Sequence, residues 1–225
     1  MGFAHRGLHD SEIPENSLAA ARAAMEIGAG IECDVQLSGC GTAMLFHDAD
    51  GKRLCGEPRS VGDTSAEAMR GWRLLDTDEP VVPLAELLDL IDGRVPLLVE
   101  MKRVHGNAER IAAATVRALG DYAGPIGLMS FSSRAMRMVR RLAPDVRRGL
   151  VLSGRETPIL RWDKMRRARP DFLAVKVSIL HQPWVAAARA DVPVYSWTAR
   201  TPEDIGQVAQ FSDAPIWEGD GHPRI

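Results

Sequence analysis

The chain has 225 residues and a mass of 24.6 kDa, of which 45% are hydrophobic and 26% are charged. This composition excludes a disordered chain, and the length allows one core that needs no disulfide or structural metal. The formal net charge is −2 and the pI is near 6.3, so no basic excess is available for nucleic acid and no polybasic run for an anionic membrane surface.

The three cysteines, Cys33, Cys40 and Cys55, have no CxxC spacing, and we expect free thiols in a reducing compartment. The first residues, MGFAHRG, show no basic segment followed by an apolar one, and charges interrupt every apolar run well before it could span a membrane. We therefore expect a soluble, cytoplasmic protein without stable membrane association. Its oligomeric state is left open.

Short apolar segments with β-type composition alternate with amphipathic helical segments along the chain. The first predicted strand, Phe3–Gly7, precedes a predicted helix over Ser17–Ile27, which Gly28 ends. The second strand is predicted over Gly30–Leu37, with Ala43–Asp48 extending it as a hairpin. These two units set the pattern that the rest of the chain repeats.

The alternation is interrupted between residues 49 and 80, where glycine and proline are frequent. Only one weak helical pattern, near Ser65–Trp72, lies in this stretch. We expect it to be a small insertion, residues 49–80, within a single domain that spans residues 1–225.

Beyond residue 80 the alternation resumes and continues to the last strand. The further strands are predicted over Pro96–Lys102, Ile126–Phe131, Arg147–Leu152, Phe172–Val177, Val192–Thr198 and Pro215–Gly219. Helices are predicted over Leu84–Ile91, Ala108–Leu119 and Ser133–Leu142, and from Pro202 with Thr201 as its N-cap.

This alternation indicates βαβ units and a parallel sheet, which is α/β architecture. Eight units fit the chain, so we predict a (β/α)8 TIM barrel with a small insertion after the second βα unit. A doubly wound open sheet is the alternative fold. That fold normally has a glycine-rich turn after its first strand, and the segment Gly7–Asp10 (GLHD) does not match GxGxxG.

Acidic side chains interrupt two of the predicted strands where apolar residues are expected. Glu32 and Asp34 are two residues apart and therefore face the same side of their strand, as do Glu100 and Lys102. A buried carboxylate needs a compensating cation, which can be a basic side chain or a metal ion. The all-oxygen set of Glu32, Asp34 and Glu100 suits Mg²⁺ or Ca²⁺ better than zinc.

Two histidines and two basic side chains lie near the ends of the same strands. His5 and His47 could each transfer a proton near neutral pH, and Arg6 and Lys102 supply fixed positive charge. In a barrel, the carboxyl-terminal ends of the strands form the active-site face. Together these groups predict a site for a phosphate ester, whose transition state carries negative charge on its oxygens.

Other polar side chains near predicted strand ends are less informative. Lys176 could contact phosphate or extend to solvent. His9 is expected in a solvated loop, and no binding role is expected for His105 or His181.

Seven short motifs together resemble the glycerophosphodiester phosphodiesterase family. They are AHRG at Ala4–Gly7, PENS at Pro14–Ser17, GIECDVQLSGCG at Gly30–Gly41, FHD at Phe46–Asp48, EMK at Glu100–Lys102, SFS at Ser130–Ser132 and SWT at Ser196–Thr198. They occur in the order of the family and cover essentially the whole chain. The combination is specific, whereas HRG or FHD alone would be weak.

The resemblance implies a role for each of nine residues in a barrel with a small insertion. One divalent cation, Mg²⁺ or Ca²⁺, is implied at Glu32, Asp34 and Glu100, two catalytic histidines at His5 and His47, and phosphate contacts at Arg6 and Lys102. Glu15 matches a glutamate that lies by the site, and Trp197 matches an aromatic residue that lines the substrate pocket.

The implied activity is metal-dependent hydrolysis of a small-molecule glycerophosphodiester to glycerol 3-phosphate and an alcohol. His5 is the preferred base and His47 the preferred acid, and the nucleophile is either water or the neighbouring glycerol hydroxyl. The alternatives are a phospholipase D-like lyase that forms a cyclic phosphate, a non-catalytic phosphodiester-binding protein, and an unrelated barrel enzyme with a metal-bound enolate.

Three departures from the family pattern concern specificity. Cys40 stands where an acidic residue is usual, Ala199 and Arg200 follow SWT where asparagine is common, and the final EGDGHP segment is one residue longer. Arg200, Glu218 and Asp220 could line the same mouth.

Overall fold

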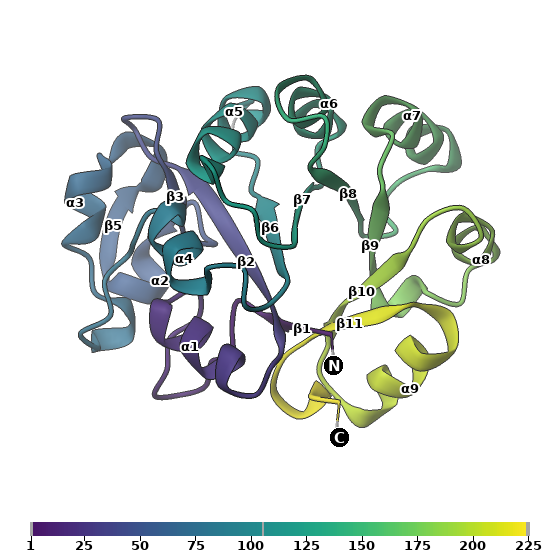
Figure 1. Ribbon diagram of the computed structural model, residues 1–225, viewed down its shortest axis with the longest axis horizontal. Coiled ribbons are helices and arrows are strands. Elements are labelled where there is room, and N and C mark those ends of the chain that lie inside the picture. Colours follow the sequence, from purple (N-terminus) through teal and green to yellow (C-terminus); the bar gives the residue numbers. More distant parts are fainter. Residues whose placement is uncertain (1, 105, 224–225) are drawn as a thin grey trace.

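The computed structural model describes residues 2–104 and 106–223 (Figure 1), so His105 lies outside the described residues. Its main sheet contains eight parallel strands, and pairing of the first strand with both the second and the last closes it into a barrel. This confirms the predicted TIM barrel, and the alternative of an open doubly wound sheet is wrong. In barrel order from the N-terminus, the strands are β1 (Phe3–His5), β2 (Gly30–Leu37), β6 (Leu97–Met101), β7 (Ile126–Ser130), β8 (Arg147–Leu152), β9 (Phe172–Lys176), β10 (Val194–Ala199) and β11 (Ala214–Trp217).

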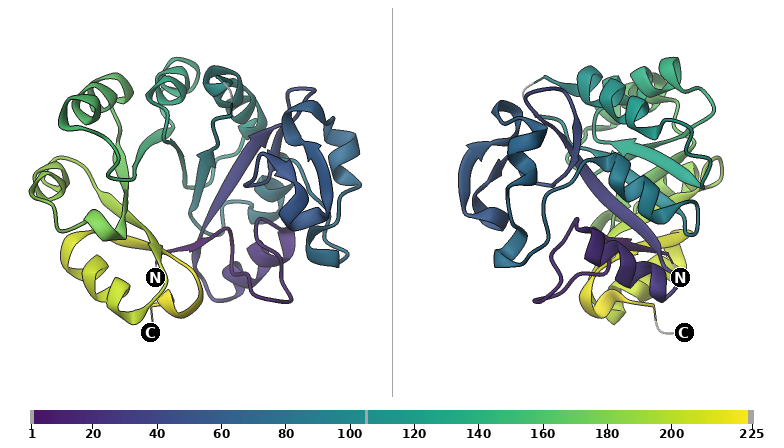
Figure 2. Two further views of the ribbon diagram at one scale, coloured as in Figure 1. Left: turned by 180° about the vertical axis from the view of Figure 1, so that it is seen from behind. Right: turned by 60° about the vertical axis from the view of Figure 1, so that its left-hand side comes forward.

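Helices surround the barrel on its outside (Figures 1 and 2). They are α1 (Leu18–Glu26), α4 (Leu84–Ile91), α5 (Ala108–Leu119), α6 (Ser133–Leu142), α7 (Pro158–Ala168), α8 (Pro183–Arg189) and α9 (Pro202–Phe211). Within the described part of the chain, β11 is followed only by a short 3₁₀ turn, η4 (Gly219–Gly221). None of the helices of residues 2–104 and 106–223 has the length and apolar character needed to cross a bilayer.

Local sequence accounts for where these helices begin and end. The Ser17 hydroxyl accepts the Ala20 N–H at 3.0 Å and caps α1, and Gly28 follows its end with φ +68°. Thr201 and Asp204 form a reciprocal capping box at the start of α9. Helices α7 and α8 were not among the predicted ones. In α7 the apolar residue Ile159 is 81% exposed, so the apolar residues of this helix do not form one buried stripe.

The segment between β2 and α4 leaves the barrel and stands to one side of it (Figure 2). It contains β3 (Ala43–Leu45), β4 (Asp50–Gly51), α2 (Lys52–Cys55), β5 (Glu57–Ser60), α3 (Ala66–Arg70), and the 3₁₀ turns η1 (Val61–Asp63) and η2 (Leu74–Asp76). A separate apolar cluster holds it together, made of Met44, Phe46, Leu54, Val61, Met69, Trp72, Leu74 and Val81. The domain limits 1–225 and the insertion limits 49–80 stay predictions.

The hairpin strand β3 is shorter than predicted. It pairs antiparallel with β2 but ends at Leu45 rather than at Asp48. The Gln36 side-chain amide donates to the backbone carbonyls of His47 and Asp48, at 2.9 and 3.0 Å. Hydrogen bonds from the Gln36 side chain thus take the place of backbone pairing at these two residues, so the chain can turn away from β2 after Leu45.

Side chains along β2 point alternately toward the surrounding helices and toward the barrel interior. Ile31, Cys33, Val35 and Leu37 belong to the core between sheet and helices, so Glu32 and Asp34 face the barrel interior. A small apolar layer fills that interior with Leu98, Met129, Val151, Phe172, Ala174 and Ile216. The charged residues of β2 therefore sit above an apolar floor, at the carboxyl-terminal end of the barrel.

Close packing of this floor leaves no room for a side chain at Gly149. A methyl group at Gly149 in β8 would overlap the ring of Phe172, whereas one at Gly206 in α9 has no neighbour within 4 Å. We expect Gly149→Ala to lower the free energy of unfolding by about 1–3 kcal/mol, as overpacking does. The same change at Gly206 should raise it by about 0.5–1 kcal/mol through helix propensity. Urea denaturation of both variants measures this, and a Gly149→Ala protein as stable as the parent would contradict it.

Candidate active site

Strand register brings the three predicted carboxylates together at the carboxyl-terminal end of the barrel. His5 is the register partner of Glu32 between β1 and β2, and Asp34 is that of Glu100 between β2 and β6. One carboxylate oxygen from each of Glu32, Asp34 and Glu100 lies within 4.8 Å of the others, and all three residues are buried. Oxygen atoms this close and this dry form a cluster that could hold a metal ion.

Two basic side chains partly compensate this buried negative charge. Lys102 Nζ lies 3.0 Å from Asp34 Oδ1 and 2.9 Å from Glu100 Oε1. Arg6 Nε lies 3.1 Å from Asp34 Oδ2, and the Arg6 backbone N–H donates to Glu32 Oε2 at 3.2 Å. Asp34, between the two cations, is therefore the best compensated of the three acids.

The pKa values of the three acids separate accordingly. Burial acts to raise the pKa of Asp34, but Lys102 and Arg6 together hold it well below its usual range. Burial, with the charges of Asp34 and Glu100 added, raises the pKa of Glu32 well above its usual value. Burial also raises the pKa of Glu100, although Lys102 opposes it. The cluster thus carries more carboxylate than its two basic partners compensate, which fits an additional cation.

Two residues with left-handed backbone angles shape the loop that follows β1. Arg6 has φ +59° and Asn16 has φ +52°, and the Asn16 N–H donates to the Arg6 carbonyl at 2.9 Å. The Asn16 side chain accepts the Asp34 N–H at 2.9 Å and donates to Asp34 Oδ2 at 3.3 Å. Several bonds of this kind can hold a sparsely populated conformation. Asn16 was not predicted as a site residue, although it lies in the quoted PENS motif.

Glu15 connects the site to the segment outside the barrel. Its carboxylate accepts from Arg6 at 2.6 Å and from both terminal nitrogens of Arg53, in α2, at 2.8 and 2.9 Å. Arg53 Nε also donates to Asp48 Oδ2 at 2.7 Å. Arg53 was not predicted from the sequence, because a single arginine in an irregular stretch carries no pattern.

Each predicted histidine is paired with a carboxylate through the same ring nitrogen. His5 Nδ1 lies 2.5 Å from Glu218 Oε2, and His47 Nδ1 lies 2.6 Å from Asp48 Oδ1. Such pairs fix the ring orientation and leave Nε2 for other contacts. Burial lowers the pKa of both imidazoles. Hydrogen bonding to His5 holds the pKa of Glu218 well below its usual range, and Glu218 also accepts from Arg200 at 2.5 Å.

A mouth of about 520 Å³ opens above the acidic cluster. Its lining includes six of the nine predicted site residues, which are His5, Arg6, His47, Glu100, Lys102 and Trp197. Trp197 donates to the Ala174 carbonyl at 3.0 Å and packs edge-on against Phe131, with ring centroids 5.5 Å apart. The structure thus gathers the predicted residues at one place, and their chemical roles stay predictions.

The remaining polar residues divide between the mouth and the outer surface. Arg200 and Lys176 also line the mouth. His9, expected in a solvated loop, has Nε2 3.8 Å from Glu218 Oε2 and forms a cluster with His5 and Glu218. Asp220, considered for the mouth, is exposed and is not part of its lining.

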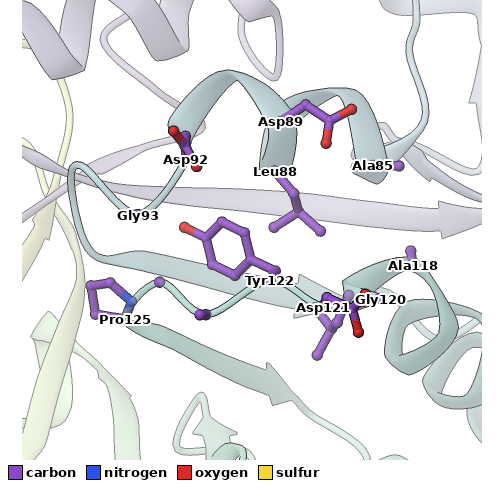
Figure 3. A pocket seen from close by; sticks show the side chains of 13 residues that line it. Ala85, Leu88, Asp89, Asp92, Gly93, Ala118, Gly120, Asp121, Tyr122 and Pro125 are labelled. Atoms are coloured by element: carbon purple, nitrogen blue, oxygen red, sulfur yellow. The ribbon is translucent and has the colours of Figure 1, made fainter.

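A different cleft, of about 640 Å³, lies at the amino-terminal ends of β6 and β7 (Figure 3). Gly93 and Pro125, which precede these strands, line it together with Asp89, Asp92 and Tyr122. Its lining contains acidic side chains and no lysine, arginine or histidine. It shares no residue with the mouth and offers no positive charge for a phosphate group.

Comparisons with known proteins show which family and which relatives the chain is similar to. The model of the Glycerophosphoryl diester phosphodiesterase family matches residues 5–214. A glycerophosphodiester phosphodiesterase of Caldanaerobacter subterraneus subsp. tengcongensis is 30% identical over 159 residues, which cover 66% of this chain. An uncharacterized protein of Bacillus subtilis is 30% identical over 163 residues, or 67% of this chain. The matched segments span 65% and 66% of these two relatives, slightly less than two thirds of their lengths.

Solved structures share the fold at lower identity. A phosphodiesterase of Oleispira antarctica, in complex with the product sn-glycerol-3-phosphate, is 22% identical with a TM-score of 0.86, covering 97% of this chain and 92% of that one. A glycerophosphodiester phosphodiesterase of Thermotoga maritima is 22% identical with a TM-score of 0.78, covering 96% of this chain and 92% of that one. At this identity the similarity establishes the barrel fold.

Opposite stability effects are expected from two substitutions in the acidic cluster. Glu32→Gln should raise the free energy of unfolding of the metal-free protein at pH 7, because it removes a buried carboxylate whose pKa lies above its unfolded value. The gain should vanish below about pH 4, where the carboxyl is neutral in both states. Asp34→Asn should instead lower it by about 3–5 kcal/mol, because Lys102 and Arg6 lose their partner. Urea unfolding in EDTA measures both, and a loss of stability in both variants would contradict the assignment.

Proposed function

The chain belongs to the glycerophosphoryl diester phosphodiesterase family, and on this premise we propose that it hydrolyses glycerophosphodiesters to glycerol 3-phosphate and an alcohol. One observation carries the proposal, which is a single mouth that combines a buried acidic cluster with two carboxylate-paired histidines. A site that only binds has no need for two oriented imidazoles. General acid–base chemistry needs both.

Glu32, Asp34 and Glu100 are proposed to hold one divalent cation. Their all-oxygen donor set suits Mg²⁺ or Ca²⁺, and burial together with the neighbouring carboxylates raises the pKa values of Glu32 and Glu100, which supports a further cation at the cluster. A cation bound there would polarise a phosphate oxygen as a Lewis acid.

Arg6 and Lys102 are proposed to bind the phosphate group. Both line the mouth and both carry positive charge next to the acidic cluster. Lys102 has three donors, and ion pairs to Asp34 and Glu100 use two of them, so one remains for a substrate oxygen. Glu15 is proposed to keep Arg6 in place through its 2.6 Å hydrogen bond, and Trp197 to provide a wall of the pocket.

His5 and His47 are proposed as the general base and the general acid. With Nδ1 of each ring held by a carboxylate, Nε2 is the nitrogen that can exchange a proton with substrate. Burial lowers the pKa of both rings, so these shifts do not distinguish the two roles, and His5 as the base is the preferred assignment. His47 would then protonate the leaving alcohol, and Asp48 would stabilise its charged form.

The substrate is proposed to be a small molecule, in keeping with the mouth of about 520 Å³. The Oleispira antarctica phosphodiesterase with its bound sn-glycerol-3-phosphate supports this class of ligand. Location in the cytoplasm stays a prediction.

Removal of either imidazole should abolish turnover. His5→Ala and His47→Ala are each expected to lower kcat by about 10²–10⁴-fold, the usual contribution of a general acid or base. Release of glycerol 3-phosphate from glycerophosphocholine measures the effect, and ³¹P NMR of the products tests for the cyclic phosphate of the lyase alternative. His181→Ala is the matched control, because His181 is exposed and does not line the mouth. Near-native turnover in either active-site variant would contradict the two-histidine scheme.

Chelation should remove the activity reversibly. EDTA is expected to reduce hydrolysis to background, and added Mg²⁺ or Ca²⁺ to restore it, because the three carboxylates bind no phosphate without a cation between them. The thermal unfolding midpoint should rise with the restoring metal in the parent protein, but not in Glu32→Gln. Full activity in EDTA would refute a divalent cation at this cluster.

A further inference from the structure

A groove of about 700 Å³ opens beside the mouth, above the carboxyl-terminal ends of β7, β8 and β9. Phe131, Lys176 and Trp197 line both the groove and the mouth. The two cavities therefore adjoin at these three side chains. A substrate whose phosphodiester lies in the mouth can extend one of its two arms into the groove.

The lining of the groove is strongly basic in a protein whose net charge is −2. Two acidic side chains line it, and each has its own partner: Glu156 lies 2.9 Å from Lys164, and Asp163 lies 2.8 Å from Arg167. Four further cations line the groove, and within residues 2–104 and 106–223 none of them has an acidic partner. They are Arg103, Arg134, Arg155 and Lys176, and all four are exposed.

The first turn of α6 contributes to the same side of the groove. Ser132 is the N-cap of this ten-residue helix, and Ser132, Ser133 and Arg134 all line the groove. The N-terminus of a helix carries partial positive charge and free backbone donors. It therefore adds to the field of the four unpaired cations rather than opposing it.

We propose that this groove binds a phosphate monoester on the alcohol arm of the substrate. The inference rests on the proposed function and specifies its substrate class, namely glycerophosphodiesters whose head group is itself phosphorylated. Guanidinium groups pair with phosphate oxygens in a bidentate manner, and three of the four unpaired cations are arginines. A cationic head group such as choline would gain no attraction from the groove, and an uncharged one would form no ion pair with these four cations.

The test compares two substrates that differ in one phosphate, glycerophosphoinositol and glycerophosphoinositol 4-phosphate. We expect the holoenzyme to have a kcat/KM at least about tenfold higher for the phosphorylated substrate. Its additional phosphate can form two charge-assisted contacts with arginine side chains, and such contacts together account for about tenfold. In the double variant Arg134→Gln/Arg155→Gln, the ratio of the two kcat/KM values should fall by about tenfold. The double variant Arg22→Gln/Arg141→Gln is the matched control, because it also removes two exposed positive charges and neither residue lines the groove.

The outcomes separate the groove from the catalytic proposal. Turnover of glycerophosphoinositol with no preference for the phosphorylated substrate would leave the proposed function intact and overturn the groove. An unchanged ratio in the Arg134→Gln/Arg155→Gln variant, or an equal change in the Arg22→Gln/Arg141→Gln control, would also overturn it. Failure of the parent holoenzyme to cleave either inositol substrate, with glycerophosphocholine still cleaved, would overturn the groove alone. Failure on all three substrates would overturn the proposed function and the groove assignment with it.

Discussion

The mouth of this barrel is organised by one electrostatic constraint, which is the burial of three carboxylates within 4.8 Å of each other. Water cannot screen them there, so the surrounding chain must supply positive charge. Lys102 and Arg6 supply part of it, and both compensate Asp34 more than Glu32. The unequal distribution leaves Glu32 as the group that gains most from an added cation. The proposed metal binding and the expected destabilisation of the metal-free protein by Glu32 would then have the same physical origin.

The same constraint explains why parts of the chain far from the strands belong to the site. Arg6 is held against Asp34 by Glu15, and Glu15 is held by Arg53 of the segment outside the barrel. Arg53 also holds Asp48, the partner of His47. One arginine therefore fixes both a phosphate-binding candidate and a histidine. The segment between β2 and α4, with its own apolar cluster, serves as a platform for this arginine.

The barrel was predictable from the sequence because its signal repeats. Alternation within β2 already placed Glu32 and Asp34 on one face, and parallel pairing of neighbouring strands makes their convergence with Glu100 a consequence of register. Helix α7 was missed because its exposed Ile159 and Trp162 obscure an apolar stripe. Periodicity describes faces of regular elements, and it holds no information on side chains in loops.

Contacts between loops are therefore the part of the site that the sequence leaves undetermined. Asn16 bonds Asp34 only because the loop after β1 turns through two left-handed residues, and His9 reaches Glu218 across the closure of the barrel. Neither pairing follows from a fixed spacing of residues in the sequence. The basic groove is a similar case, since its unpaired cations come from four separate segments and become neighbours only above the strand ends. The cleft at the amino-terminal ends of β6 and β7 is lined by acids instead, so the two cavities carry opposite charge. The proposed anionic substrate would therefore be attracted to the groove and not to that cleft.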